Sequence, residues 1–341
     1  MELSALRLVG VVLSLGSILL LVWRRRSGRL LLRREVLGFV ASVLVLAVAI
    51  APSLADVLVR ATGFQGDLSR VVSLLAFTSL GLVLWAAQSQ ARLEETRARL
   101  LGWMREATAE RVEKVPVDIL CVLPALNEAD NLPAVLRQAP AEIEGFSVRC
   151  LIVDDGSDDG TAEVAVANGA LAVRTPINVG GGHALQIGFA AAARLGARWV
   201  VTLDADGQHR FSDLPTLMAP LLRGEADVVV GSRQLGESIG HEATRAIGLR
   251  VFNLILSVLT GRRLTDCSSG YRAFELKSLR TLRLVQDRHH TAELLIEASR
   301  RGLRVAEVPI TIAPRLSGES KKGTNLWYGL RFAKTVWSSW W

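Results

Sequence analysis

The sequence predicts an α/β domain with a mainly parallel sheet, preceded by an all-α transmembrane domain. Three long apolar runs occupy the first ninety of the 341 residues. From residue 117 onward, short apolar runs alternate with helical patterns, and polar residues gather where the apolar runs stop. Such alternation is typical of βαβ units. The length accommodates one large domain and an accessory part.

The three N-terminal runs have the length and composition of membrane helices. They cover residues 3–23, 36–59 and 71–87, with few internal charges, and about 20 apolar residues cross a bilayer. A signal peptide would account for the first run, and a soluble helical bundle for all three. Neither fits well, because no small-residue cleavage site follows the first run and charge inside the runs is scarce.

An arginine cluster at residues 24–34 separates the first two runs. The positive-inside rule puts this loop in the cytoplasm, so the N-terminus faces outward and the domain after the third run is cytoplasmic. The net charge of +7 also fits an anionic membrane surface better than nucleic acid, because the arginines flank apolar runs.

Residues 88–114 are rich in Arg, Glu, Ala and Leu. They predict an amphipathic connector helix that lies on the membrane or forms a short coiled coil, which leaves a homo-oligomer open. Cys121, Cys150 and Cys267 are far apart and form no C-x-x-C pair. We expect them to be reduced, buried thiols.

The α/β region is predicted to begin at Pro116. Its expected strands are residues 117–123, 148–153, 170–174, 199–203, 227–230 and 305–312. Its expected helices are residues 129–138, a segment ending near 168, and 184–195. Ligands of parallel sheets bind outside the carboxyl ends of the strands, so the loops that follow these strands are the candidate site.

The most informative loop follows the strand at residues 199–203, where Asp204 and Asp206 flank one small residue. Two carboxylates at this spacing suit Mg²⁺ or Mn²⁺, which also takes oxygens from a substrate diphosphate. Gln208 and His209 would complete or flank that shell. The alternative is a polar turn that merely ends a strand.

Two further loops carry unusual polar residues. Asp155 follows the second strand, where a carboxylate accepts hydrogen bonds from a nucleobase N–H or a ribose hydroxyl. Its neighbours Asp158 or Asp159 are expected to cap the next helix. The glycine run at residues 180–182 lets backbone approach a ligand at a helix N-terminus, but it is neither a P-loop nor a dinucleotide motif.

These loops belong to an ordered set of motifs: PALNEADN, VDDGSDDGT, DADGQH, GSR, DCSSGYRAF, AELLIEA, EVPI and RLSGESKKG. The set resembles the family 2 glycosyltransferases, and most closely their dolichol-phosphate mannose synthase and polyprenyl-phosphate glycosyltransferase branch, over about residues 117–323. The first three helices resemble a small membrane domain found fused to or beside such enzymes. The resemblance implies a GT-A fold, a nucleotide-diphosphate-sugar donor, a divalent cation and inversion at the anomeric carbon.

The resemblance also implies roles for individual residues. A nucleotide-sugar pocket would be formed by Pro124, Asn127, Glu128, Asp155 and Gly181. The metal and donor diphosphate would be held by Asp204, Asp206 and Gln208, which together with Arg233 form the expected catalytic set. The Q-x-x-R-W motif of processive polysaccharide synthases is absent from the sequence, which favours transfer of one sugar at a time.

The acceptor side is expected in the second half of the chain. Arginine's planar fork suits phosphate oxygens. The candidates for the acceptor phosphate are Arg233, Arg245, Ser269 and Arg272, with Asp266 in the same polar loop. Arg250 is better explained as a solvated surface residue. The adjacent His289 and His290 are not expected to bind metal.

A cationic loop at residues 315–323 is expected to close over the donor diphosphate, with Arg315 and Lys321 stabilising the charge on the leaving nucleotide diphosphate. The alternative is a basic loop that only contacts lipid headgroups. The tryptophan-rich tail after it has the composition of an interfacial helix.

The expected division is residues 1–88, membrane domain; 89–115, connector; 116–323, glycosyltransferase domain; and 324–341, interfacial helix. We therefore expect an integral-membrane enzyme that transfers one sugar to a polyprenyl phosphate on the cytoplasmic face. Two alternatives remain open: transfer to another lipid or a protein, and a catalytically silent membrane scaffold.

Overall fold

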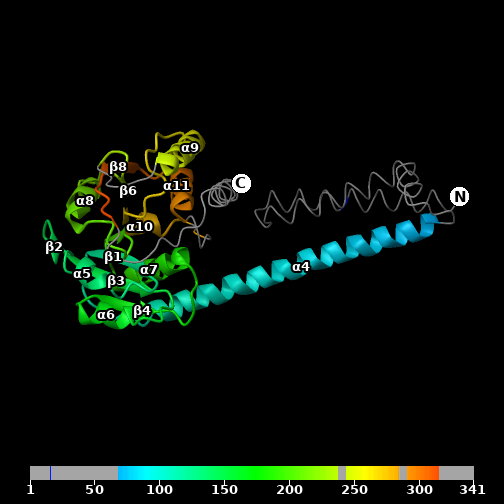
Figure 1. Ribbon diagram of the computed structural model, residues 1–341, viewed down its shortest axis with the longest axis horizontal. Helices are drawn as coiled ribbons and strands as arrows, with labels where there is room; N and C mark the ends of the chain where they lie inside the picture. The colour runs from blue at the N-terminus through cyan, green and yellow to red at the C-terminus, as the bar shows by residue number, and fades with distance from the viewer. Residues whose placement is uncertain (1–15, 17–67, 237–242, 283, 285–289, 315–341) are drawn as a thin grey trace. The chain divides into compact units, whose positions relative to one another are not determined.

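The computed structural model describes residues 68–236, 243–282 and 290–314, together with residues 16 and 284 (Figure 1). The chain divides into two compact units, Met1–Leu100 and Leu101–Trp341. The apolar runs expected at residues 3–23 and 36–59 lie outside the described residues, apart from Gly16. So do the cationic loop and the tail, with Arg315 and Lys321.

The third apolar run and the connector are one continuous helix, α4, Leu68–Ala109. They were expected as a membrane span followed by a separate amphipathic helix. No proline interrupts this stretch, so the helical hydrogen bonds run through the expected junction. Within the part of the chain that the structure describes, no helix combines the length and the apolar character that crossing a membrane requires.

The second unit is built on an eight-stranded sheet of order β2-β3-β1-β5-β7-β6-β8, with β4 paired to β3. Four strand pairs are parallel: β1–β3, β1–β5, β3–β4 and β6–β8. The strands are β1 Ile119–Ala125, β2 Glu142–Ile143, β3 Phe146–Asp154, β4 Leu171–Arg174, β5 Trp199–Thr202, β6 Val228–Ser232, β7 Arg272–Glu275 and β8 Val305–Pro309.

Most strands share one direction, as the expectation of a mainly parallel sheet requires, but the sheet is mixed. β7 lies between β5 and β6 and is antiparallel to both. No strand was expected between residues 227–230 and 305–312. The sequence did not reveal β7 because this strand is only four residues long and begins at an arginine, Arg272, whose side chain is buried with the strand.

Helices cover both faces of the sheet (Figure 1). One face packs against α5, α6 and α8, and the other against α7, α10 and α11 together with the end of α4. Beside α4, the helices are α5 Leu132–Leu136, α6 Thr161–Ala167, α7 Gly181–Leu195, the 3-10 turn η1 Phe211–Asp213, α8 Leu214–Leu222, α9 Ala243–Thr260, α10 Leu276–Leu279 and α11 His290–Arg300.

The alternation of side chains along β1 explains the two cores. Ile119, Cys121 and Leu123 point into one core, and Leu120 and Val122 into the other. All five are completely buried, as a central strand covered on both faces requires. Cys121, Cys150 and Cys267 are free and buried, as expected.

The parallel strands β1, β3, β5 and β6 end at one edge of the sheet, and the predicted polar loops follow those ends. Because β7 is antiparallel, it begins at this edge. Arg272, its first residue, is in register with Thr202 of β5 and Val230 of β6. The loop that precedes β7 therefore enters the sheet between the ends of β5 and β6.

Candidate functional site

Asp204 and Asp206 begin the turn after β5, as the sequence predicts. The Asp204 side chain is 47% exposed, whereas Asp206 is buried and its Oδ1 accepts the backbone N–H of Gln208 at 3.1 Å. Gly270 lies against Asp204, because a Cβ at Gly270 would be 3.1 Å from Asp204 Oδ1. A side chain at position 270 would therefore crowd the carboxylate.

His209 lies beneath this turn. Its ring is buried, its Nε2 lies 3.7 Å from Asp204 Oδ2, and its ring centroid is 5.1 Å from that of Tyr271. His209 pairs with Ile312 in an isolated bridge, and the N–H of Ala313 donates to the carbonyl of Gln208 at 3.0 Å. The segment after β8 is thus attached to the Asp204–His209 turn.

The donor chemistry of this turn fits a cation shared with a substrate. Within residues 68–236, 243–282 and 290–314, no three His, Cys, Asp or Glu side chains converge as a metal-binding cluster. Mg²⁺ commonly takes one or two protein carboxylates and completes its shell with water and substrate phosphates. Asp204 and Asp206 match that pattern, and the half-exposed Asp204 carboxylate is accessible to a ligand.

Asp155, at the end of β3, organises the glycine turn before α7. Its Oδ1 accepts the N–H of Val179 at 2.7 Å, and its Oδ2 accepts the N–H of Gly180 at 2.9 Å. Burial raises the pKa of this carboxyl, and the two backbone hydrogen bonds offset only part of that effect. Helix α7 begins at Gly181, where an added Cβ would meet no atom within 4 Å.

Asn127 joins the loop after β1 to the loop after β3. Its N–H donates to Ser157 Oγ at 2.9 Å, and its Oδ1 accepts the N–H of Asp158 at 3.0 Å. Asn127 is exposed and has a φ of +53°, a conformation that stores strain in a residue other than glycine and is common at functional sites.

The remaining residues of this side have mostly structural contacts. The N-cap of α6 is Gly160, not Asp158 or Asp159. Asp159 accepts the N–H and the hydroxyl of Thr161, the first residue of α6, and the N–H of Ala129 at 3.0 Å. Glu128 Oε2 accepts Asn131 Nδ2 at 2.6 Å. Pro124 is half-buried within β1.

Arg233 follows β6 and is held by Asp266 in a two-pronged ion pair. Its Nε lies 2.6 Å from Asp266 Oδ2, its Nη2 lies 2.7 Å from Asp266 Oδ1, and Nη2 also donates to Ser268 Oγ at 2.5 Å. Among the described residues, none accepts a hydrogen bond from Nη1. This nitrogen is the part of the guanidinium that remains for a ligand.

The electrostatics of the pair favour its charged form. Burial opposes ionisation of Asp266, but the hydrogen bonds and charge of Arg233 outweigh it and hold the pKa of the carboxyl below its ordinary value. Burial likewise opposes the charge on Arg233, yet the contact with Asp266 raises its pKa, and the charge of Asp204 contributes in the same direction. Asp204 and Arg233 therefore influence each other electrostatically.

Arg272 and Ser269 do not occupy the positions expected of phosphate ligands. Arg272 is 1% exposed, and its Nε and Nη2 donate to the carbonyls of Ser269 and Cys267, both at 2.9 Å. Its Nη1 donates to the carbonyl of Thr291 at 2.5 Å. Ser269 is 2% exposed. The Arg272 guanidinium therefore holds the loop in shape. Each of its three nitrogens already donates to a carbonyl, so none is left to bind an acceptor phosphate. The backbone of Arg245 lies in α9, but its side chain is outside the described residues.

The residues that sequence reasoning missed hold the same loop from outside. Glu307 of β8 accepts the N–H groups of Thr265, at 2.8 Å, and Asp266, at 3.1 Å. Asn253 of α9 donates to the carbonyl of Thr265 and accepts the N–H of Cys267. Glu307 left a signal in the sequence, since it is a carboxylate within an apolar strand, whereas Asn253 left none.

Comparison with known sequences gives a consistent family. A sequence profile described as Glycosyl transferase family 2 matches residues 120–283. The chain is 31% identical over 214 residues to the undecaprenyl-phosphate mannosyltransferase of Micrococcus luteus, covering 60% of this chain and 86% of that protein. It is also 31% identical over 236 residues to the UDP-N-acetylglucosamine–dolichyl-phosphate N-acetylglucosaminyltransferase of Methanococcus voltae, covering 62% and 92%.

Solved structures give the same fold. Glucosyl-3-phosphoglycerate synthase from Mycobacterium tuberculosis, in complex with Mg²⁺ and UDP, superposes with a TM-score of 0.53 at 25% identity, covering 70% of this chain and 83% of that one. The same enzyme with Mn²⁺, UDP-glucose and phosphoglyceric acid gives 0.52 at 23% identity, with the same coverage. The mixed sheet is therefore a GT-A-like glycosyltransferase fold. Together with the sequence relatives, this agreement shows that the chain belongs to glycosyltransferase family 2.

Proposed function

We propose that this chain transfers a single sugar from a nucleotide-diphosphate sugar to a polyprenyl phosphate at the cytoplasmic face of a membrane. The observation that carries the proposal is the loop from Asp266 to Gly270. Its first residue binds Arg233, and its last lies against Asp204. One short loop thus connects a carboxylate suited to a donor with a guanidinium suited to an acceptor phosphate.

The donor side is proposed to use Asp204, Asp206 and Gln208. Carboxylates repel a diphosphate unless a cation lies between them, and the two aspartates would hold Mg²⁺ or Mn²⁺. Such a cation, when bound, neutralises charge on the leaving nucleotide diphosphate. The proposed nucleotide contacts are the exposed loop residue Asn127, with Pro124 and Glu128 in the same loop region. The turn that Asp155 fixes at Val179 and Gly180 would add Gly181, the residue that follows it.

The acceptor side is proposed to use Arg233. An oxygen of the lipid phosphate forms a bond to the anomeric carbon while the bond from that carbon to the diphosphate oxygen breaks, and the electron pair leaves with the nucleotide diphosphate. Attack from the opposite face inverts the configuration. Because the acceptor phosphate is already ionised near neutral pH, orientation by Arg233 contributes more than a general base would.

The relatives support this choice of acceptor. Two of them are named for undecaprenyl phosphate and dolichyl phosphate, and the structural neighbour was crystallised with UDP and a divalent cation. The membrane location rests on the N-terminal apolar runs and the arginine cluster at residues 24–34. The division at residues 1–88, 89–115, 116–323 and 324–341 belongs to the same proposal, as do the contacts of Arg315 and Lys321 with the donor.

The test is an acceptor competition with the full chain in detergent. A panel of radiolabelled UDP and GDP sugars is offered with Mn²⁺ and either undecaprenyl phosphate or 3-phosphoglycerate. We expect label in the organic phase only with the lipid phosphate. Arg233→Lys, which keeps the charge but loses the planar fork, should lower that transfer more than it lowers nucleotide binding.

Two results would contradict the proposal. Label on 3-phosphoglycerate or protein, with none on lipid, would assign another acceptor. Absence of nucleotide release with every donor, in a folded preparation, would favour the silent scaffold.

A further inference from the structure

Helix α9 is apolar on two opposite sides. Its inner side packs Leu256, which is completely buried, against α11. Its outer side carries Val251, Leu254 and Val258, which are 49%, 65% and 74% exposed, and Ile255, which is 40% exposed. Burial in the fold explains the inner side only.

The four outer residues form one continuous stripe. Positions 251, 254, 255 and 258 have the i, i+3, i+4, i+7 spacing that places side chains on one face of a helix. Four adjacent, largely exposed aliphatic side chains are unusual on a soluble surface and mark an interaction site.

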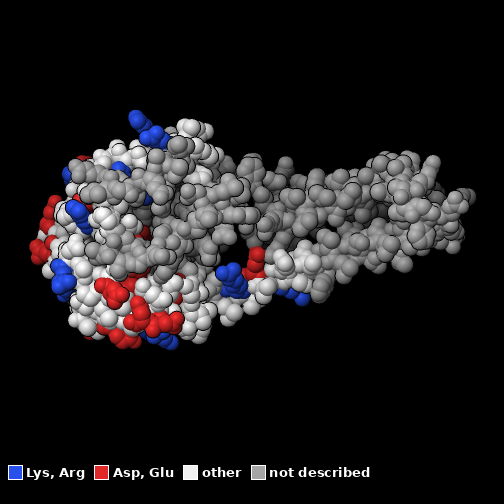
Figure 2. All heavy atoms as spheres, viewed as in Figure 1, with Lys and Arg blue, Asp and Glu red and all other residues white. Residues whose placement is uncertain are grey.

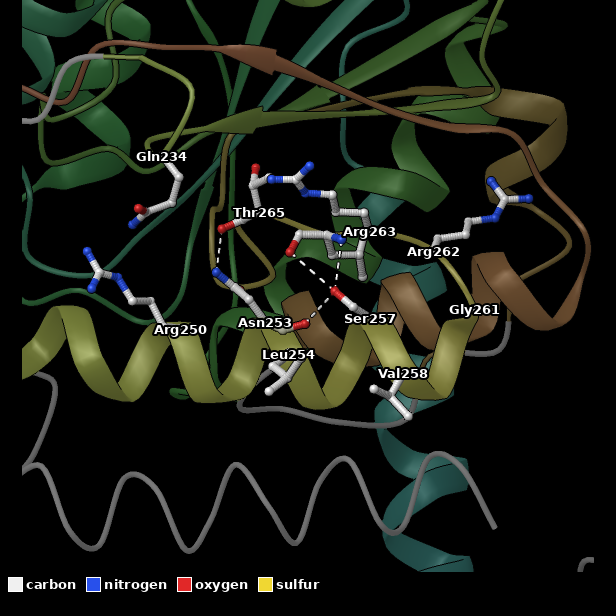
Figure 3. Close-up of a pocket in the computed structure, with 11 residues that line it drawn as sticks. Gln234, Arg250, Asn253, Leu254, Ser257, Val258, Gly261, Arg262, Arg263 and Thr265 are labelled. Atoms are coloured by element: carbon white, nitrogen blue, oxygen red, sulfur yellow. Dashed lines mark hydrogen bonds between the residues drawn. The ribbon is translucent and has the colours of Figure 1, made fainter.

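A basic cavity of about 570 Å³ borders this stripe (Figure 3). Arg250, Arg262 and Arg263 line it, with Asn253 and Ser257 of α9 between them. In the described part of the chain, no carboxylate pairs with these three arginines. Figure 3 shows the arginines spaced along the helix, on the side where Thr265 lies. The cavity therefore presents uncompensated positive charge next to an apolar stripe.

We propose that this surface docks on an anionic lipid bilayer. Leu254 and Val258 enter the boundary between headgroups and acyl chains, and Arg250, Arg262 and Arg263 bind the phosphates of anionic lipids beside them. An apolar stripe bordered by arginines is the composition of helices that lie in the plane of a membrane interface. The inference rests on the proposed function in one respect, because a polyprenyl phosphate acceptor requires the site to reach a membrane.

The distribution of charge supports a specific orientation. In Figure 2, carboxylates gather over the region of α5 and α6, and one group of basic side chains lies at the α9 corner, with others along the rim of the unit. An anionic bilayer attracts the second region and repels the first.

Docking at α9 also has a direct structural path to Arg233. Asn253 and Ser257, on the cavity side of α9, bind the backbone of Leu264, Thr265 and Cys267. Asp266 lies within that segment and holds Arg233. Bilayer contact at α9 therefore positions Arg233 beside the headgroups from which a lipid phosphate would arrive.

The test measures the depth of α9 in a bilayer without any turnover. Val258→Cys in the full chain is labelled with an environment-sensitive fluorophore, and the protein is reconstituted into nanodiscs of phosphatidylcholine, or of equal parts phosphatidylcholine and phosphatidylglycerol. No polyprenyl phosphate, nucleotide sugar or metal is present. We expect lipids with a nitroxide on the acyl chain to quench the label only in the anionic discs. Val166→Cys, on α6 and 60% exposed, serves as the control that stays unquenched.

The arginines are tested by replacement. Arg250→Gln, Arg262→Gln and Arg263→Gln together should reduce docking, by about fivefold in the docking equilibrium for each charge. Replacement of the exposed Arg137, Arg149 and Arg223 by Gln removes the same charge elsewhere and should leave docking unchanged. Transfer measured in detergent should stay at the wild-type level in both triple variants.

Three outcomes would overturn the inference. The first is a label on Val258→Cys that remains in water in anionic discs, and the second is a cavity triple variant that docks as the wild type does. A label that is shielded from water but not quenched by lipid would show that a second copy, or another segment of this chain, covers the stripe. If docking occurs as expected but no sugar reaches a lipid phosphate, the proposed function fails while the docking surface stands.

Discussion

Single charged residues at this site are held in place by backbone groups as much as by one another. Asp206 is buried against the N–H of Gln208, and Asp155 against those of Val179 and Gly180. A carboxylate fixed in this way needs no rearrangement when a ligand binds, which is the condition for strong electrostatic stabilisation.

Replacing Asp206 by Asn is the most conservative test of the proposal that Asp204 and Asp206 hold a cation. The amide oxygen can still accept the Gln208 N–H, so we expect the midpoint of thermal unfolding to stay near that of the wild type. The lost charge should lower Mn²⁺-dependent transfer by on the order of 100-fold. Binding of a fluorescent UDP analogue is measured with and without Mn²⁺, and an undiminished Mn²⁺ effect in the variant would refute the assignment.

Replacing Asp266 by Asn tests the ion pair with Arg233. Removing one partner of a largely buried pair should cost about 3 kcal/mol of unfolding free energy and raise the KM for the lipid acceptor more than that for the donor. The check is urea unfolding combined with steady-state kinetics for both substrates. A matched loss of affinity for both substrates would argue against an acceptor role for Arg233.

The ion pair between Arg233 and Asp266 also determines the direction in which the unfolding free energy changes with pH. Since the pKa of Asp266 is lowered in the folded protein, its stabilising contribution is complete above the ordinary aspartate pKa, about 4. That contribution is lost as the pH falls through the lower folded value. Between pH 5 and pH 2, the unfolding free energy of the wild type should therefore fall more steeply than that of Asp266→Asn.

At the scale of elements, the segment from Leu264 to Tyr271 is held by neighbours on every side. Thr202 of β5 donates to the carbonyl of Gly270 at 2.8 Å, and the N–H of Gly231 of β6 donates to that of Tyr271 at 2.9 Å. Arg272 binds the segment through the carbonyls of Cys267 and Ser269, and it binds α11 through the carbonyl of Thr291. This loop is thus a rigid support for the site, although its sequence is polar and rich in serine.

Arg272→Met measures how much of that rigidity comes from one side chain. Methionine fills similar space but leaves the carbonyls of Cys267, Ser269 and Thr291 without their donor, which should cost roughly 2–5 kcal/mol of unfolding free energy. Arg223→Met, at an exposed position, is the control and should change stability little. Hydrogen exchange of the Leu264–Tyr271 amides should rise in the first variant alone; unchanged exchange would show that the other neighbours suffice.

At the scale of the whole molecule, the proposed location predicts a labelling pattern in intact cells. Val166→Cys on α6 should react with an impermeant maleimide only after lysis, whereas Gln65→Cys, between the second and third apolar runs, should react before it. The native cysteines are buried, so they can remain in the background. The reverse pattern would place the catalytic unit outside, away from nucleotide sugars.

How much the sequence revealed depended on whether burial and polarity changed sharply along the chain. β1, β3 and β5 were predictable because apolar runs stop at Asn127, Asp155 and Asp204. The helix expected at residues 129–138 is shorter, Leu132–Leu136, because Pro133 can stand only in the first turn of a helix.

Long-range contacts were not predictable in the same way. Arg272 is drawn into the core by carbonyls contributed from two other segments, Cys267 to Ser269 and Thr291. Nothing local to Arg272 distinguishes it from a surface arginine. The sequence therefore identified the motif correctly and assigned the wrong role to this member of it.

The insertion of β7 between β5 and β6 sets the distance between the ends of these two strands. Neighbouring strands lie about 4.8 Å apart, so the ends of β5 and β6, which lead to Asp204 and Arg233, are separated by roughly two such steps. Direct pairing of β5 with β6 would halve that interval. The separation between the two strand ends is fixed because Arg272 is in register with both strands. A redesign that changes the separation of Asp204 and Arg233 would therefore have to change the strand that lies between them.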